Sequence, residues 1–255
     1  MEQTKQRFFL EIAYDGTAYH GWQVQDNAVS VQQRLHEALQ KILRIPIETI
    51  GAGRTDTGVH ARQLFVHFDA DEQSILDTDR FLHSLNALLP YDIAAKRVLP
   101  VAHDAHARFD ATERSYEYHI HWGKNPFLRH RSWQLRDLPN STLMNLAAEL
   151  LLGKQDFGCF SKSHTQVFTN ICTIKHAAWE TTAHGLIFHI TADRFLRNMV
   201  RAIVGTLLEI GLDKKPVTWM TDVIRSKDRA QAGTSVPAHG LYLTRVIYPY
   251  ISELS

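Results

Sequence analysis

The segment Phe8-Phe9-Leu10-Glu11-Ile12-Ala13-Tyr14-Asp15-Gly16 carries large apolar or aromatic side chains at Phe8, Leu10, Ile12 and Tyr14, every second position. Alternate residues of an extended chain point to the same side, so this spacing predicts a strand with one buried face. Asp and Gly are common turn residues, and the strand is therefore expected to end at Asp15-Gly16.

The first half of the chain continues with an alternation of helical and extended patterns. Ser30 and Gln33 have the spacing of a capping box, which marks the start of a helix. Pro90 cannot continue a helix and marks the end of another. The expected elements are a helix over about 31–43, a strand at 64–68, a helix from about 81 to 89 and a strand at 93–101.

The second half repeats this alternation. The expected elements are a strand at 116–120, a helix over 141–152 closed by Gly153, a hairpin of 171–181 and 186–192, a helix over 195–210, a helix after Pro216 and a strand at 241–248. We place the boundary near residue 105, which gives an N-terminal half of 1–105 and a C-terminal half of 106–255. We therefore expect an α+β fold of two ferredoxin-like, RRM-like halves that form one continuous, mixed, mostly antiparallel sheet with helices packed on one face.

The composition is typical of a folded, soluble protein. The chain has 255 residues, of which 44% are hydrophobic and 22% charged. No apolar run approaches the roughly 20 residues that cross a bilayer, and the polar first residues lack a secretory signal, so we expect a cytoplasmic protein. The formal charge is +1, and binding to nucleic acid therefore needs a local patch. Cys159 and Cys172 form no CxxC pair and are expected as reduced core thiols.

The run Gly51-Ala52-Gly53-Arg54-Thr55-Asp56-Thr57-Gly58-Val59-His60-Ala61-Arg62 is the main candidate for chemistry. Val59 and His60 replace the Lys and Ser or Thr of a phosphate-binding loop, and Asp56 replaces the third glycine of a dinucleotide-binding loop. Asp56 lies two residues from Arg54, and Arg62 follows within reach. A neighbouring guanidinium favours a charged carboxylate, which suits a nucleophile or a general base. The alternative is a surface turn with an Arg–Asp pair.

The helix predicted over 195–210 places arginines on one flank. At about 100° per residue, Arg194, Arg197 and Arg201 cluster there, apart from the apolar stripe. The positions four residues later hold no Asp or Glu that could pair with them. Arginines without an acidic residue four positions later suit phosphate groups, and the alternative is an ordinary solvated helix face.

Two weaker patterns involve a loop and four histidines. Lys124, Arg129 and Arg131 surround Pro126-Phe127, a mixture that suits an RNA backbone as well as a solvated loop. Two histidine pairs have metal-ligand spacings, but no carboxylate or cysteine set completes a site, and we expect no metal. These pairs are His103 with His106 and His119 with His121.

The run from Gly51 to Ala61 closely resembles the signature of TruA-type tRNA pseudouridine synthases, which usually have Ala where Thr57 stands. Three further segments match this family in the same order, and the resemblance spans nearly the whole chain. They are Arg114-Ser115-Tyr116-Glu117-Tyr118, Phe195-Leu196-Arg197-Asn198-Met199-Val200-Arg201 and Pro237-Ala238-His239-Gly240-Leu241-Tyr242-Leu243. Asn198 stands where many relatives have His, a change that we expect to affect local packing.

The resemblance implies that the protein isomerises uridine to pseudouridine at positions 38 to 40 of the tRNA anticodon stem-loop, as a homodimer and without a cofactor. It also implies that Asp56 is the essential carboxylate, which attacks the ribose C1′ or the base C6, or takes a ribose proton. An ionised carboxylate fits each of these roles. The target base must leave its stack, and the resemblance implies that Arg54 contacts the RNA there.

The other matching motifs imply contacts with the substrate. By resemblance, Tyr116 packs on the target base, Arg201 pairs with Asp56, and Leu241 forms an apolar wall against the uracil. From the pattern alone, Tyr116 and Leu241 also fit the core of the fold, where we expect Tyr118. The remaining candidates for RNA contacts are Arg62, Arg194, Arg197, Lys124, Arg129 and Arg131.

Two other functions fit parts of the sequence. A non-catalytic RNA-binding module would present aromatic residues to RNA, and Asp56 would only structure its loop. A nucleoside or sugar hydrolase would use Asp56 on a glycosidic bond and release a free base. Such enzymes usually have two placed carboxylates, and no second acidic residue has a comparable setting in this sequence.

Overall fold

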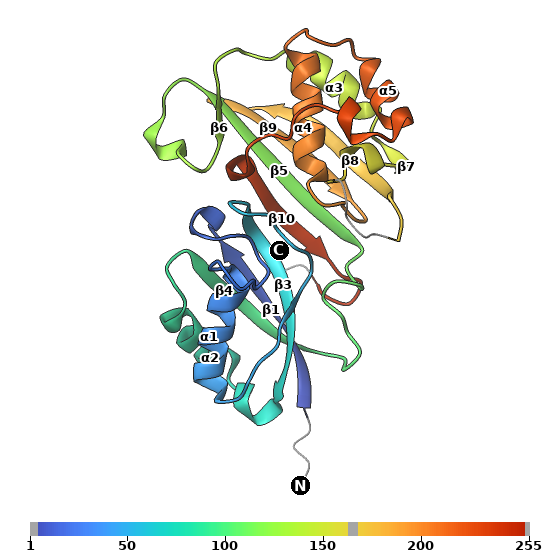
Figure 1. The fold of residues 1–255 in the computed structure, drawn as a ribbon. Coiled ribbons are helices and arrows are strands. Elements are labelled where there is room, and N and C mark those ends of the chain that lie inside the picture. Colours follow the sequence, from blue (N-terminus) through green and yellow to red (C-terminus); the bar gives the residue numbers. More distant parts are fainter. Residues whose placement is uncertain (1–4, 163–167, 253–255) are drawn as a thin grey trace. The chain divides into compact units, whose positions relative to one another are not determined.

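The computed structural model describes residues 5–162 and 168–252. These residues form ten strands and five α-helices, and the strands make a mixed, mostly antiparallel sheet (Figure 1). The predicted fold class is confirmed. The chain divides into two compact units, the first made of Met1–Thr112 with Leu243–Ser255 and the second of Glu113–Tyr242. Among the described residues, no helix is long and apolar enough to cross a membrane.

The sheet of the first unit is built around the strand that the opening segment predicts. Strand β1 (Lys5–Tyr14) lies between β3 (His60–Asp71) and β4 (Ile93–Val101) and is antiparallel to both. The short β2 (Ile50–Gly51) pairs with β3, and the part of β10 (Leu241–Ile247) that belongs to this unit lies beside β3.

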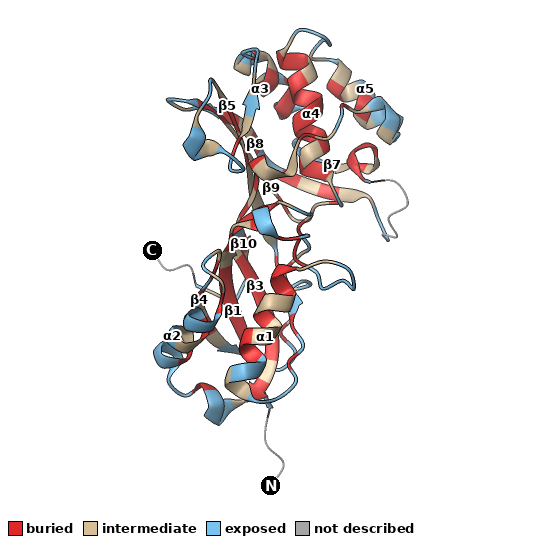
Figure 2. Ribbon diagram, turned by 60° about the vertical axis from the view of Figure 1, so that its left-hand side comes forward, coloured by how far each residue is buried: buried red, intermediate tan, exposed pale blue. Residues whose placement is uncertain are grey.

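The register of β1 and β3 buries their apolar side chains together. Leu10 faces Val66 and Ile12 faces Leu64, and all four side chains are inaccessible to solvent. Burial of each contributes roughly 1.5–3 kcal/mol to the free energy of folding. Figure 2 shows these strand centres as buried.

Two helices cover this sheet, and both start at side-chain caps. Helix α1 (Val31–Leu43) begins after Ser30, whose hydroxyl accepts a hydrogen bond from the Gln33 backbone N–H at 3.2 Å, as the capping box predicts. Helix α2 (Thr78–Leu88) is capped by Asp77 and ends before Pro90. The two helices contact each other, and α2 also packs on β4.

The second unit has its own strand order, β5-β9-β8-β7. Its strands are β5 (Glu113–Trp122), β6 (Trp133–Leu135), β7 (Gly153–Asp156), β8 (Ile171–Thr181) and β9 (Gly185–Ala192). The predicted hairpin is confirmed as β8 and β9, while β6, parallel to β5, and β7 were not predicted. Three or four residues are too short to show a periodicity.

The helices of the second unit are α3 (Ser141–Glu149), α4 (Met199–Gly211) and α5 (Trp219–Ser226). Helix α3 contacts α4 and β8. Most of α4 is buried, as Figure 2 shows, and Ala202, Ile203 and Val204 are fully enclosed. Cys159 and Cys172 are unpaired and buried, and burial raises the pKa of each thiol to about 12.

The predicted start of the long helix is wrong, and so is the arginine flank built on it. Asn198 has a left-handed backbone (φ 67°), and the helix begins at Met199. Before it, the Asp193 carboxylate accepts the backbone N–H groups of Arg194, at 2.7 Å, and of Thr173, at 2.8 Å. Arg194 and Arg197 therefore lie in an irregular segment, and only Arg201 is on the helix.

Candidate functional site

The candidate catalytic loop lies between β2 and β3 in the first unit, and its centre is fixed by Thr55. The buried Thr55 hydroxyl is hydrogen-bonded to the Tyr14 hydroxyl at 2.8 Å, and the Thr55 carbonyl accepts the Trp22 backbone N–H at 3.2 Å. The two residues that flank Thr55 remain accessible, because Arg54 is exposed and Asp56 is half-buried. The loop thus presents a carboxylate and a guanidinium from an anchored backbone.

The second part of the loop is a turn that leads into β3. The Val59 backbone N–H donates to the Asp56 carbonyl at 3.1 Å, and the Gly58 N–H donates to the Tyr19 carbonyl at 3.3 Å. Gly58 has φ 77°, a conformation that side chains disfavour. Arg62 follows on β3 with an exposed side chain. The backbone on both sides of Asp56 is therefore held by hydrogen bonds.

Two glycines of the loop differ in what surrounds them. A Cβ on Gly51 would lie 2.8 Å from Nε1 of Trp22, whose side chain is buried. A Cβ on Gly53 would meet nothing within 4 Å. The fold therefore requires glycine at the first position, whereas at Gly53 it leaves open space beside Arg54.

In the second unit, the two tyrosines of β5 have different environments. Tyr116 is half-buried, and its ring forms a T-shaped pair with Phe195 at a centroid distance of 5.1 Å. Tyr118 is fully buried and donates its hydroxyl to the Pro237 carbonyl at 2.7 Å, and burial raises its pKa. Tyr118 thus belongs to the core, as predicted, whereas part of Tyr116 is accessible.

Arg201 is held in the first turns of α4 by the segment that precedes β10. Its Nε donates to the Val236 carbonyl at 2.7 Å, and the Val236 N–H donates to the Arg201 carbonyl at 3.2 Å. This segment, residues 232–237, touches the helix backbone, since a Cβ on Gly205 would lie 1.9 Å from the Thr234 carbonyl oxygen. The Arg201 guanidinium is therefore positioned by α4 and by residues 232–237.

The other residues of the matching motifs in this unit are partly structural. Asn198 donates to the Ser235 hydroxyl at 2.5 Å, so it joins the start of α4 to the same 232–237 segment. Leu241, the first residue of β10, is only 6% exposed. Arg197 is exposed and Arg194 is half-buried.

The remaining predicted RNA contacts lie on the loop between β5 and β6. Lys124, Arg129 and Arg131 are all exposed there. His60 lies within the matching motif, but the sequence predicted no role for it. It is 2% exposed and accepts the Gly16 backbone N–H at Nδ1, 3.0 Å away. That contact ties the end of β1 to the start of β3, and a lone histidine in a glycine-rich run gave no signal for it.

Three histidines of the two pairs form hydrogen bonds or ion pairs within the protein. His106 Nδ1 accepts the Arg108 backbone N–H at 3.1 Å, and His119 Nε2 lies 2.8 Å from a carboxylate oxygen of Glu117. His121 is hydrogen-bonded to the Ser132 hydroxyl at 3.0 Å. In residues 5–162 and 168–252, no three His, Cys, Asp or Glu side chains gather in a way that could hold a metal ion.

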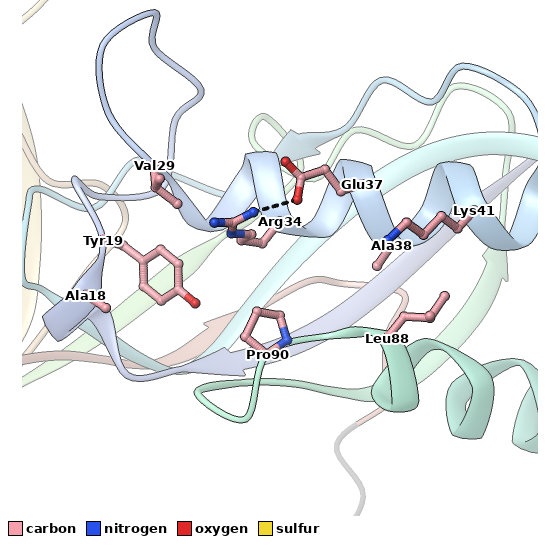
Figure 3. Close-up of a pocket in the computed structure, with 9 residues that line it drawn as sticks. All are labelled: Ala18, Tyr19, Val29, Arg34, Glu37, Ala38, Lys41, Leu88 and Pro90. Carbon is pink, nitrogen blue, oxygen red and sulfur yellow. Dashed lines mark hydrogen bonds and ion pairs between the residues drawn. The ribbon is translucent and has the colours of Figure 1, made fainter.

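A pocket of about 460 Å³ lies in the first unit between α1 and the end of α2 (Figure 3). Its polar lining includes Arg34 and Glu37, which form an ion pair of 2.8 Å, and Lys41. The rest of its lining is Ala18, Tyr19, Val29, Ala38, Leu88 and Pro90. None of these is a predicted site residue.

Comparison with known proteins gives consistent matches over this chain. Residues 12–110 and 147–249 match the model of a family described as tRNA pseudouridine synthase. The chain is 50% identical over 245 residues to tRNA pseudouridine synthase A of Bacteroides fragilis, covering 96% of this chain and 97% of that protein. It is 51% identical over 248 residues to the Bacteroides thetaiotaomicron protein of that name (96% and 91%) and 40% identical over 250 residues to that of Colwellia psychrerythraea (97% and 96%).

Proposed function

The chain belongs to the tRNA pseudouridine synthase family, and we propose that it acts at positions 38 to 40 of the tRNA anticodon stem-loop with Asp56 as an ionised catalytic carboxylate. It is an isomerase, because conversion of uridine to pseudouridine moves the uracil from an N1 to a C5 linkage on the same ribose. We further propose that the enzyme works in the cytoplasm.

The anchoring of Thr55 is the observation that carries the role of Asp56. Hydrogen bonds from Tyr14 and Trp22 hold the residue before it, and Val59 binds its own carbonyl. A reacting group must be held close to its productive position, since small misplacements cost large factors in rate. Each version of the reaction needs a negative group as nucleophile or base, which an ionised Asp56 supplies.

We propose that three residues of the second unit complete the site. Tyr116 would pack on the target uracil, with its ring orientation set by Phe195. Arg201 would pair with Asp56, and the hydrogen bond from its Nε to Val236 supports a fixed guanidinium. Leu241 would form the apolar wall. In this proposal, the N-terminal half carries the aspartate and the C-terminal half carries its partners.

The proposed RNA contacts are mostly exposed cations. Phosphate groups release counterions when Lys and Arg bind them, so such contacts make tRNA affinity fall as salt rises. Arg194 is half-buried and the others are exposed, which supports contact with a large anionic ligand. These residues are Arg54, Arg62, Arg194, Arg197, Lys124, Arg129 and Arg131.

We also propose that the protein forms a homodimer. The support comes from exposed leucine side chains on α3 and on the residues that flank it. Leu138, Leu146, Leu150 and Leu152 are all exposed there, at 68%, 48%, 38% and 44%. Exposed apolar side chains on and beside one helix are consistent with a protein interface. Leu146→Glu should therefore convert a dimer to monomers in sedimentation experiments, whereas Val24→Glu, at another exposed apolar residue in the first unit, should not. A Leu146→Glu dimer as tight as wild type would place the interface elsewhere.

The direct test of the function is Asp56→Asn. Asn keeps the size of the side chain but supplies neither a negative charge nor a base, so the variant should bind tRNA normally and form no pseudouridine. Nucleosides from tRNA incubated with the protein measure the product, and filter binding measures the affinity. Asp137→Asn, at an exposed loop residue, is the matched control and should remain active.

The same experiment separates the rival functions. A wild-type protein that binds tRNA without forming pseudouridine would be a binding module. Release of free uracil would identify a hydrolase. Turnover by Asp56→Asn at the wild-type rate would refute the proposed role of this carboxylate.

A further inference from the structure

The loop between β5 and β6 presents an aromatic ring to solvent. Phe127 lies in a short 3₁₀ turn, Pro126–Leu128, and its side chain is 84% exposed. Burying a phenylalanine typically contributes 1.5–3 kcal/mol, so the fold gains little from this ring where it stands. A large apolar side chain held outside the core is available to a partner.

The turn that carries Phe127 is held by hydrogen bonds. The Asn125 side chain caps it by accepting the Phe127 backbone N–H at 3.0 Å. After the ring, the Arg131 N–H donates to the Leu128 carbonyl at 3.0 Å. Gly123 and His130 both have positive φ, at 76° and 60°, a conformation that is uncommon for a non-glycine residue. The ring is therefore displayed on an ordered loop.

The C-terminal end of the loop is fixed to the body of the second unit. The Tyr242 hydroxyl donates to the Arg131 carbonyl at 2.7 Å, and the buried Ser132 hydroxyl is bonded to His121 at 3.0 Å. Directly afterwards β6 pairs with β5. A ring on such a support loses little conformational entropy when a ligand stacks on it.

The charged residues of this loop are of one sign. Residues 123–134 contain Lys124, Arg129 and Arg131 but no Asp or Glu. All three cations are exposed. A surface that combines an aromatic face with cations and no carboxylate is complementary to single-stranded nucleic acid, in which flat bases alternate with phosphate groups.

We propose that Phe127 stacks on an unpaired base of the bound tRNA, at a point other than the target uridine, while Lys124 and Arg129 contact the flanking phosphates. This inference rests on tRNA being the substrate, as proposed above. Stacking is tolerant of sequence, since every base has a flat face. The loop would thus add affinity for tRNAs of different sequence without selecting among them.

The test compares tRNA binding by Phe127→Ala and Phe127→Tyr with that of the wild type. Loss of one base stack should raise the Kd of Phe127→Ala for unmodified tRNA about tenfold, while Phe127→Tyr keeps a stacking ring and should bind within twofold of wild type. The rate at saturating tRNA should be unchanged in both. Tyr91→Ala removes another fully exposed ring, in the first unit, and should bind normally.

The cations give an independent readout. Lys124→Gln and Arg129→Gln should each lower the slope of log affinity against log salt by about one, whereas Phe127→Ala should leave that slope unchanged. A Phe127→Ala variant with wild-type affinity for tRNA would overturn the proposal. Weaker self-association of Phe127→Ala in sedimentation would also overturn it and make the loop a subunit contact.

The result of the Phe127 binding experiment can be distinguished from a failure of the proposed function. If wild-type protein bound tRNA without making pseudouridine, the catalytic assignment of Asp56 would fail. Selective loss of binding in Phe127→Ala would still support stacking.

Discussion

At the scale of single residues, the sequence points to Asp56 but not to what holds it. Val59 and His60 exclude one phosphate-binding loop and Asp56 excludes another, which leaves Asp56 as a carboxylate on a glycine-rich loop. The hydrogen-bond partners of the loop lie more than 30 residues earlier, and no local pattern predicts them. Tyr19 and Trp22 bind its backbone, and Tyr14 binds the Thr55 hydroxyl. Contacts with residues distant in sequence also decide that the fold requires glycine at Gly51 but not at Gly53.

Alanine substitutions at two glycines of this loop should change stability in opposite directions. Gly51→Ala places a methyl group against the buried Trp22 ring and should lower the free energy of unfolding by about 1–3 kcal/mol. Gly53→Ala meets open space without a positive φ, and it should raise that free energy by about 0.4–1 kcal/mol, because the unfolded chain loses freedom. Urea unfolding curves measure both, and equal shifts would contradict this account of the loop.

At the scale of elements, hydrophobic periodicity predicted most helices and strands but misplaced the start of α4. Apolar positions continue the helical spacing back to Leu196, which is buried although it precedes the helix. The side chain of Asp193 and the left-handed Asn198 decide the backbone there instead. Periodicity reports which residues are buried, and it does not report hydrogen bonds between side chain and backbone that stop a helix.

The contact between α4 and residues 232–237 should be sensitive to one methyl group. Gly205→Ala would place its Cβ against the Thr234 carbonyl and push this segment away from the helix, which should destabilise the protein by about 1–3 kcal/mol. The hydrogen bond that positions Arg201 would be lost with it, so kcat should fall even under conditions where the variant is fully folded.

Gly211→Ala is the control for this prediction in the same helix. Its Cβ would meet the flexible Met144 side chain and the Pro139 ring at the last residue of α4, whereas Arg201 lies in the first turn. It should lower the melting temperature without a selective loss of kcat. A Gly205→Ala enzyme with wild-type kcat would show that residues 232–237 do not position the arginine.

At the scale of the whole molecule, the order of helices and strands and the α+β class followed from the sequence, because long amphipathic elements carry a clear period. The short strands β6 and β7 were not predicted from the sequence, because they form by pairing with β5 and β8. The candidate residues of the second unit were identified by motif, and their geometry depends on segments distant in sequence, such as Val236 beside Arg201.

Stability should fall as the solution is acidified from pH 6.5 to about 4. Burial lowers the pKa of His67 to about 4, and burial also lowers the pKa values of His36 and His121. Below pH 6.5 these histidines therefore bind protons more readily in the unfolded chain than in the folded protein, which lowers the free energy of unfolding. The loss caused by His67 levels off only below about pH 4. Unfolding free energies against pH measure this, and His67→Gln should show a shallower slope in that window. An unchanged slope would contradict the assignment.

The most direct measurement is the position of pseudouridine in unmodified tRNA incubated with the purified protein. We expect new pseudouridine at positions 38, 39 or 40 with the wild type and none with Asp56→Asn, although both bind the RNA. Pseudouridine at other positions would contradict the proposed site of action, and equal product from the two proteins would contradict catalysis by Asp56.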